Sequence, residues 1–174
     1  MNRFFLVDCN NFFVSCERLF NPKLNNKPVV VLSSNDSCVI ARSNEAKTLG
    51  IAMGAPAFEC IEIFKKHNVI TYSANFGLYC DMSSRVMKTL ADYATDIEVY
   101  SIDEAFLFVA KPIEPATYLS EGYFIKKKVA QATGIPVSIG IGPTKTLAKI
   151  ATRLAKKSPS YKGVFDITNH PEID

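Results

Sequence analysis

The chain has 174 residues, of which 48% are hydrophobic, and its formal net charge is +3. This length and apolar content exclude a disordered chain and suffice for one globular core, or for a core that carries a smaller lobe. The five cysteines are scattered and form no C-x-x-C pair, so the pattern indicates neither a disulfide framework nor a zinc site.

The first part of the chain predicts alternating strands and helices. Residues 4–7 form a short apolar run that predicts a strand ending at Asp8, and Asn10 and Asn11 offer an N-cap for a helix to about residue 19. The next expected elements are a hairpin of strands 28–32 and 38–41, a helix capped by Ser43 that stops at Gly50, a helix that begins with Pro56 and reaches residue 66, and a strand at 69–73.

The second part predicts a helix at 77–93 and then two strands, 97–102 and 104–109, joined by a very tight turn or a bulged bend. A helix at 115–133, a strand at 137–141, a helix at 144–155 and a strand at 164–166 follow. If about 11–72 is set aside as an insertion, the order is strand, helix, strand, strand, helix, strand, which is typical of the ferredoxin-like split βαβ. We therefore predict an α+β fold with two lobes.

Three carboxylates fall where these strands end. Asp8 follows the first strand, and Asp103 and Glu104 occupy the bend of the central hairpin, which is its neighbour in a split βαβ sheet. Crowded carboxylates repel unless cations neutralise them, and hard oxygen ligands favour Mg²⁺. Two such ions suit an in-line displacement at phosphorus. The spacing alone favours the simpler interpretation that these acids merely end a strand and occupy a turn.

Basic residues concentrate in the C-terminal half. Residues 126–162 contain nine lysines and arginines and no acid, so this half prefers anions, unless it is an ordinary solvated face. No secretory signal opens the chain, and no apolar stretch approaches the roughly 18 residues that cross a bilayer. We expect a cytoplasmic protein without membrane contact.

Two local motifs decide between these interpretations. Leu-Val-Asp-Cys-Asn-Asn-Phe-Phe-Val-Ser-Cys-Glu at 6–17 and Tyr-Ser-Ile-Asp-Glu-Ala-Phe at 100–106 closely match the signature motifs of Y-family translesion DNA polymerases. Further segments resemble the UmuC-type branch, the ImpB/MucB/SamB family, and these are 21–24, 27–32, 38–47, 75–83, 140–151 and 155–157. The resemblance implies a palm at approximately 1–10 and 77–166, inserted fingers at 11–76, and no thumb or little finger within these residues.

The resemblance also assigns roles to the carboxylates. By position, Asp8 and Asp103 would hold both Mg²⁺ ions, and the backbone carbonyl of Cys9 would be a further ligand. Glu104 would complete the site at the metal of the primer terminus. All three acids would then be catalytic.

A second group of positions would bind the deoxynucleoside triphosphate. Phe13 falls at the steric gate, where a flat ring under the sugar leaves no room for a 2′-hydroxyl; only one ring can face the sugar, so Phe12 is the better candidate for a core residue. Lys47 falls where many relatives have an Arg phosphate contact, and Asn44 where they have Tyr. Lys keeps the charge but loses the bidentate fork. Lys156 matches a late lysine that reaches the triphosphate.

The function implied is error-prone, template-directed translesion DNA synthesis in the nucleoid, as part of the SOS response to DNA damage. Lys145 and Lys149, four apart on one helix, would lie along the backbone of primer-template DNA. A UmuD-type accessory subunit, a recombinase filament and a sliding clamp are the implied protein partners. One alternative is a folded remnant that binds nucleotide or a partner subunit without turnover. Another, a nucleotide-cyclase palm, gives no reason for the aromatic pair after Asp8.

Overall fold

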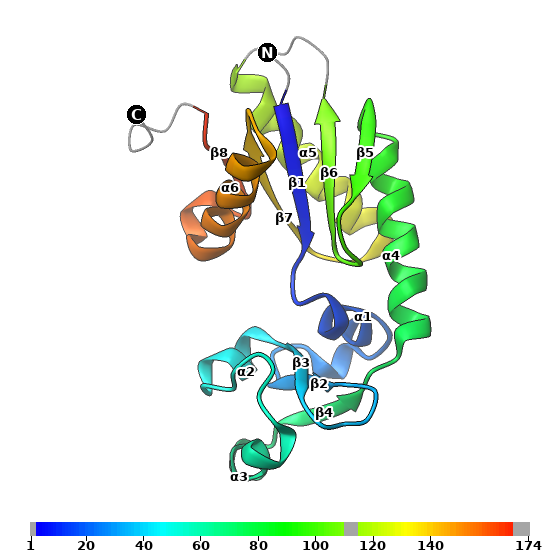
Figure 1. Cartoon of the computed structure of the whole chain (residues 1–174), viewed down its shortest axis with the longest axis vertical. Helices are drawn as coiled ribbons and strands as arrows, with labels where there is room; N and C mark the ends of the chain where they lie inside the picture. The colour runs from blue at the N-terminus through cyan, green and yellow to red at the C-terminus, as the bar shows by residue number, and fades with distance from the viewer. Residues whose placement is uncertain (1–2, 110–114, 169–174) are drawn as a thin grey trace. The chain divides into compact units, whose positions relative to one another are not determined.

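The computed structural model describes residues 3–109 and 115–168, which fold into two compact units (Figure 1). The first unit consists of Met1–Asn10 and Met82–Asp174, and the second is Asn11–Asp81. The boundary between them falls inside helix α4 (Phe76–Ala91).

The first unit is built on one sheet. In the described residues its five strands have the order β5-β6-β1-β7-β8, and neighbouring strands are antiparallel except β7 and β8. The strands are β1 (Arg3–Cys9), β5 (Asp96–Val99), β6 (Glu104–Val109), β7 (Val137–Gly142) and β8 (Val164–Asp166). The helices are α5 (Pro115–Thr133), α6 (Lys145–Lys157) and the 3-10 turn η3 (Pro159–Tyr161), together with the last part of α4.

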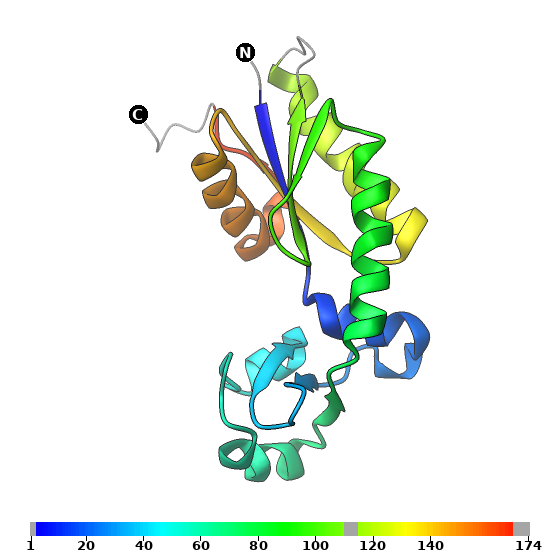
Figure 2. The same cartoon turned by 45° about the vertical axis from the view of Figure 1, so that its right-hand side comes forward.

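Helices cover both faces of this sheet. Helix α5 lies on one face and α6 on the other, and both contact β7 (Figures 1 and 2). Every residue of β7 is buried, as expected for a strand covered on both faces. The order β1, α4, β5, β6, α5, β7 agrees with the predicted order of elements once residues 11–72 are set aside.

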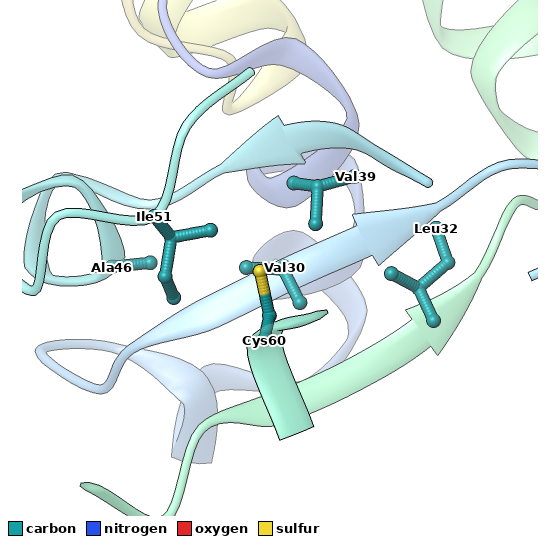
Figure 3. Packing of buried hydrophobic residues seen from close by; sticks show 6 residues of the cluster. All are labelled: Val30, Leu32, Val39, Ala46, Ile51 and Cys60. Carbon is teal, nitrogen blue, oxygen red and sulfur yellow. The ribbon is translucent and has the colours of Figure 1, made fainter. Parts of the chain in front are cut away.

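The second unit has a small sheet with the strand order β3-β2-β4. Strand β2 (Val29–Leu32) pairs antiparallel with β3 (Val39–Arg42) and parallel with β4 (Ile70–Ser73), which confirms the predicted hairpin. The other elements are α1 (Phe12–Phe20), η1 (Pro22–Leu24), α2 (Asn44–Thr48), η2 (Ala57–Cys60) and α3 (Ile61–His67). The core of this unit, shown in Figure 3, consists of Val30, Leu32, Val39, Ala46, Ile51 and Cys60.

The prediction of a helix that begins with Pro56 is wrong for its first turn. Pro56 has an extended ψ of 129°, the residues after it form the 3-10 turn η2, and the α-helix begins only at Ile61. The backbone N–H of Ala57 donates to the carbonyl of Ser37, 2.9 Å away, so this segment is held against the β2–β3 hairpin instead of entering a helix. The predicted cap by Ser43 is confirmed, because its hydroxyl accepts from the N–H of Ala46. In the part of the chain that the structure describes, no helix has the length and apolar character of a membrane span.

Candidate active site

The strand ends of the first unit bring the three candidate carboxylates onto adjacent backbone segments. Asp8, the second-last residue of β1, is the register partner of Glu104, the first residue of β6. The N–H of Cys9 donates to the backbone carbonyl of Asp103 at 2.9 Å, which ties the turn before β6 to the end of β1. Ser101, inside that turn, donates to Oδ1 of Asp103 at 2.8 Å and orients its carboxylate.

A lysine neutralises Asp8, one of these three acids. Nζ of Lys156 lies 2.5 Å from Oδ1 of Asp8, whose side chain is 13% exposed. Burial raises the pKa of the Asp8 carboxyl to about 6; the ammonium of Lys156 opposes this rise, and the negative charges of Glu104 and Asp103 add to it. The structure therefore brings together Asp8 and Lys156. The resemblance implied that Asp8 would bind Mg²⁺ and that Lys156 would reach the triphosphate.

Lys156 reaches Asp8 because α6 packs unusually close to β7. A Cβ on Gly140 would lie 2.1 Å from the backbone N of Thr152 and 2.3 Å from the carbonyl oxygen of Ala148, so only glycine permits this approach. The buried hydroxyl of Thr152 lies within hydrogen-bonding distance of the carbonyl oxygens of Ala148 (2.9 Å) and of Leu6 on β1 (3.2 Å). The last turn of α6, which carries Lys156, is thereby held over the end of β1.

The donor chemistry of this group suits Mg²⁺. Asp8, Asp103 and Glu104 offer hard carboxylate oxygens at neighbouring strand ends, and Asp8 already attracts a cation, the ammonium of Lys156. Within residues 3–109 and 115–168, no three metal-ligating side chains lie close enough together to hold an ion. The carboxylates are thus adjacent along the strand ends but are not gathered into a cation site in the described part of the chain.

The aromatic residues that are candidates for nucleotide binding, Phe12 and Phe13, lie in the second unit. Phe12 is 4% exposed, so its ring belongs to the interior, while Phe13 is only partly buried. The ring of Phe13 stacks on that of Tyr79, with centroids 4.4 Å apart, and meets Phe76 edge-on at 5.9 Å. Tyr79 is fully buried, and its hydroxyl donates to Oε1 of Glu17 at 2.8 Å. Burial, with further help from Glu17, raises the pKa of Tyr79, so the phenol keeps its proton.

The polar candidates Asn44 and Lys47 lie on α2 and meet the residue that precedes α1. Nδ2 of Asn11 donates to Oδ1 of Asn44 at 3.0 Å, and Nζ of Lys47 donates to Oδ1 of Asn11 at 2.5 Å. Asn11 does occupy the N-cap of α1, as predicted, but its side chain does not cap the helix. Its side chain binds α2 instead.

The candidate DNA-binding lysines of α6 both contact groups on the β5–β6 side of the sheet. Lys145 pairs with Oε2 of Glu98 at 2.5 Å and lies 5.5 Å from the ring centroid of Phe106. Lys149 lies 4.5 Å from the centroid of Tyr100, a ring that is 54% exposed. Aromatic rings and a carboxylate thus hold both ammonium groups on this surface.

Three residues of the site were not assigned roles from the sequence. Ser101 and Tyr79 lie inside the signature segments, but their partners Asp103 and Glu17 are evident only in three dimensions. Gly140 could have been found from the G-x-G spacing at the end of a strand, which often marks a close backbone approach.

Sequence comparison defines the class to which this fold and these residues belong. The sequence model of the impB/mucB/samB family matches residues 7–153, and the chain belongs to this family. It is 47% identical over 167 residues to the protein UmuC of Salmonella typhimurium, and the match covers 95% of this chain and 40% of that protein. It is 35% identical to DNA polymerase IV of Saccharolobus solfataricus, with 86% of this chain and 44% of that protein covered.

Solved structures agree with this placement. DinB from Sulfolobus solfataricus superposes with a TM-score of 0.85 at 31% identity, over 97% of this chain and 49% of that one. An insertion ternary complex of Dbh DNA polymerase gives a TM-score of 0.85 at 30% identity, over 99% of this chain and 49% of that one. The chain therefore spans somewhat under half the length of these relatives and corresponds to part of a Y-family DNA polymerase.

Proposed function

We propose that this chain carries the catalytic centre of an error-prone translesion DNA polymerase that acts by two-metal nucleotidyl transfer. In this proposal the first unit is a ferredoxin-like palm and the second is the fingers. The observation that carries the proposal is the register of Asp8 opposite Glu104, with Asp103 tied to the same strand end through the N–H of Cys9. The three carboxylates lie at one sheet end, with Asp8 in the first family motif and Asp103 and Glu104 in the second.

Asp8, Asp103, Glu104 and the carbonyl of Cys9 would hold the two Mg²⁺ ions. When bound, these ions lower the pKa of the attacking hydroxyl and stabilise the entering and leaving oxygens. Lys156 keeps Asp8 neutralised in the free protein, at 2.5 Å. With Asp8 serving as a metal ligand, the ammonium of Lys156 would be available to neutralise the triphosphate.

The second unit would select and hold the substrate. The ring of Phe13, fixed by Tyr79, excludes a 2′-hydroxyl and so favours deoxynucleotides. Lys47 contacts the phosphates, Asn44 lies beside it at the nucleotide-binding position, and Phe12 supports the gate from the core, with its centroid 5.8 Å from that of Phe13. Substrate selection then depends on a rigid aromatic pair and on the cation of Lys47.

Primer-template DNA would be the macromolecular substrate. Two of the solved relatives are described as ternary complexes of Dbh, and one of these as an insertion complex. Lys145 and Lys149 would contact the DNA backbone, which adds affinity without sequence preference. A UmuD-type subunit, a recombinase filament and a sliding clamp are proposed as further partners.

A chimera tests the proposal. The chain is fused to the remaining part of Salmonella UmuC, and primer extension across a lesion is measured with Mg²⁺ and four deoxynucleotides. Extension is expected, and Asp103→Ala should abolish it while leaving the circular dichroism and the melting temperature intact. A folded chimera that binds nucleotide but never extends the primer would instead support the non-catalytic alternative.

A further inference from the structure

The first residue of the second unit, Asn11, has an unusual backbone. Asn11 has φ 46° and ψ 51°, which places it in the left-handed region that asparagine tolerates better than most residues. It directly precedes α1, where a capping side chain would normally accept from the helix N–H groups. The Asn11 side chain makes no such bond, so the strained backbone conformation serves another contact.

That contact is with α2. One carboxamide bonds two partners at once: Oδ1 of Asn11 accepts from Nζ of Lys47 at 2.5 Å, and Nδ2 donates to Oδ1 of Asn44 at 3.0 Å. The bond that Nδ2 of Asn11 donates to Asn44 fixes which end of the Asn11 amide faces the lysine, because the amide nitrogen is already engaged. The bond from Lys47 is charge-assisted and therefore the stronger of the two.

A lysine at position 47 gains from having its side chain ordered before a phosphate binds. A lysine ammonium is a point charge on a flexible four-carbon stem, and it lacks the planar fork with which arginine grips a phosphate. Ordering a free lysine on a ligand costs conformational entropy at the moment of binding. A carboxamide that already orders the stem removes part of that cost.

We propose that Asn11, itself oriented by Asn44, is a positioning residue that pre-orders Lys47 for the nucleotide triphosphate. This inference rests on the proposed function, in which Lys47 contacts phosphate. Asn11 need not touch the nucleotide itself. The left-handed backbone at the start of α1 is the feature that directs its carboxamide toward α2.

The test is binding of dATP with Mg²⁺ to the full chain by calorimetry. Asn11→Gly removes the carboxamide while glycine keeps the left-handed backbone free of strain. It should weaken binding about three- to tenfold, which is the effect expected when one long side chain must be ordered on binding. Asn44→Ala should give a smaller loss in the same direction. Asn68→Gly is the matched control, because Asn68 also has a left-handed φ of 51°, and its substitution should leave binding unchanged.

A double-mutant cycle separates positioning from direct contact. In a Lys47→Ala background Asn11→Gly should have no further effect, whereas a direct contact of Asn11 with the nucleotide would still be lost. In a Lys47→Arg background the effect of Asn11→Gly should also shrink, because the fork of arginine orders itself on phosphate. An undiminished effect of Asn11→Gly in either background overturns the inference.

A second readout needs no ligand. The ammonium protons of Lys47, observed by nitrogen-15 NMR, should exchange with water more slowly than those of the exposed Lys65 and Lys66, and Asn11→Gly should reduce this protection. Equal exchange in the unaltered chain overturns the inference. If Lys47→Ala weakens dATP binding but Asn11→Gly does not, the positioning role alone fails. If the unaltered chain binds no dATP, or Lys47→Ala has no effect, the proposed phosphate role fails and the inference falls with it.

Discussion

The ring of Phe13 lies nearly parallel to the ring of Tyr79, with centroids 4.4 Å apart and planes 13° apart. Tyr79 cannot turn away, because it is fully buried and its hydroxyl is bonded to Glu17. An offset aromatic pair of this kind contributes about 0.5–1.5 kcal/mol beyond its buried area. The partly exposed ring of Phe13 therefore has a fixed orientation.

Phe13→Ala in the chimera should lower the discrimination against ribonucleotides by about tenfold or more, which corresponds to ~1.4 kcal/mol. The reason is that the substitution removes the ring that, in the proposed function, excludes the 2′-hydroxyl. The measurement is the ratio of kcat/KM values for dATP and ATP in single-nucleotide extension. Phe12→Leu is the control: it should lower the melting temperature, because Phe12 is buried, and leave the ratio unchanged. If the ratio also stays constant in Phe13→Ala, the gate lies elsewhere.

The pKa of Asp8 predicts an unusual dependence of stability on pH. Because this pKa is raised from 3.8 to about 6 on folding, the folded state holds a proton that the unfolded state has lost. The free energy of unfolding should therefore fall as pH rises through this window, by about 3 kcal/mol at most. Urea denaturation between pH 3.5 and 7.5 measures this free energy of unfolding. Subtracting the value for Asp8→Asn at each pH isolates the contribution of the Asp8 carboxyl.

Asp8→Asn should match the unaltered chain at pH 3.5 and exceed its stability at pH 7.5, because the amide is never charged. Added Mg²⁺ should stabilise the unaltered chain at pH 7.5, where Asp8 is ionised, and much less at pH 5. It should not stabilise the Asn variant at either pH. A stability difference that does not change with pH would contradict the raised pKa.

Lys156→Ala removes the cation that opposes the effect of burial on Asp8. The pKa of the Asp8 carboxyl should then rise above about 6, which carbon-13 NMR of the side-chain carboxyl measures directly. Lys157→Ala is the neighbouring control, because Lys157 is exposed and no ion pair of it is seen in the described part of the chain. An unchanged titration in Lys156→Ala would show that the ion pair does not persist in solution.

Gly140→Ala should destabilise the first unit by about 1–3 kcal/mol or more, since its Cβ would overlap the backbone of α6 and cores tolerate overpacking poorly. The added Cβ would lie 2.1 Å from the N of Thr152. Gly77→Ala is the matched control: the nearest atom to its Cβ is Oδ1 of Asn75 at 3.6 Å, so it should be neutral or slightly stabilising. Thermal denaturation distinguishes the two, and equal melting temperatures would contradict the close packing of α6.

Much of the fold could be predicted because its signals are local. The apolar run before Asp8, the hairpin around residues 33–37 and the cap at Ser43 each depend on a few neighbouring residues. The helix expected at Pro56 failed for the opposite reason. A hydrogen bond from Ala57 to Ser37, twenty positions away, outweighs the local preference for a helix.

Candidate site residues could be named from the sequence, but their arrangement could not be predicted. Asp8, Asp103 and Glu104 were found through flanking motifs, whereas the pairing of Asp8 with Lys156 depends on how closely α6 approaches the sheet. The side chain of Asn11 illustrates the same limit. Asparagine before a helix usually caps it, and nothing local indicates that this one bonds α2 instead.

Strand β1 is paired with a neighbouring strand on each side, and this pairing limits the local motion of Asp8. Asp8 is in register with Glu104 on one side and with Ser138 on the other, so its backbone can be released only when both ladders break. Asp103 lies in a turn that can open locally. Amide hydrogen exchange should therefore be slowest along β1 and faster in the turn at 100–103. Asp8 is therefore held on a strand that is paired on both sides, and local motion near the carboxylates falls to the turn that carries Asp103.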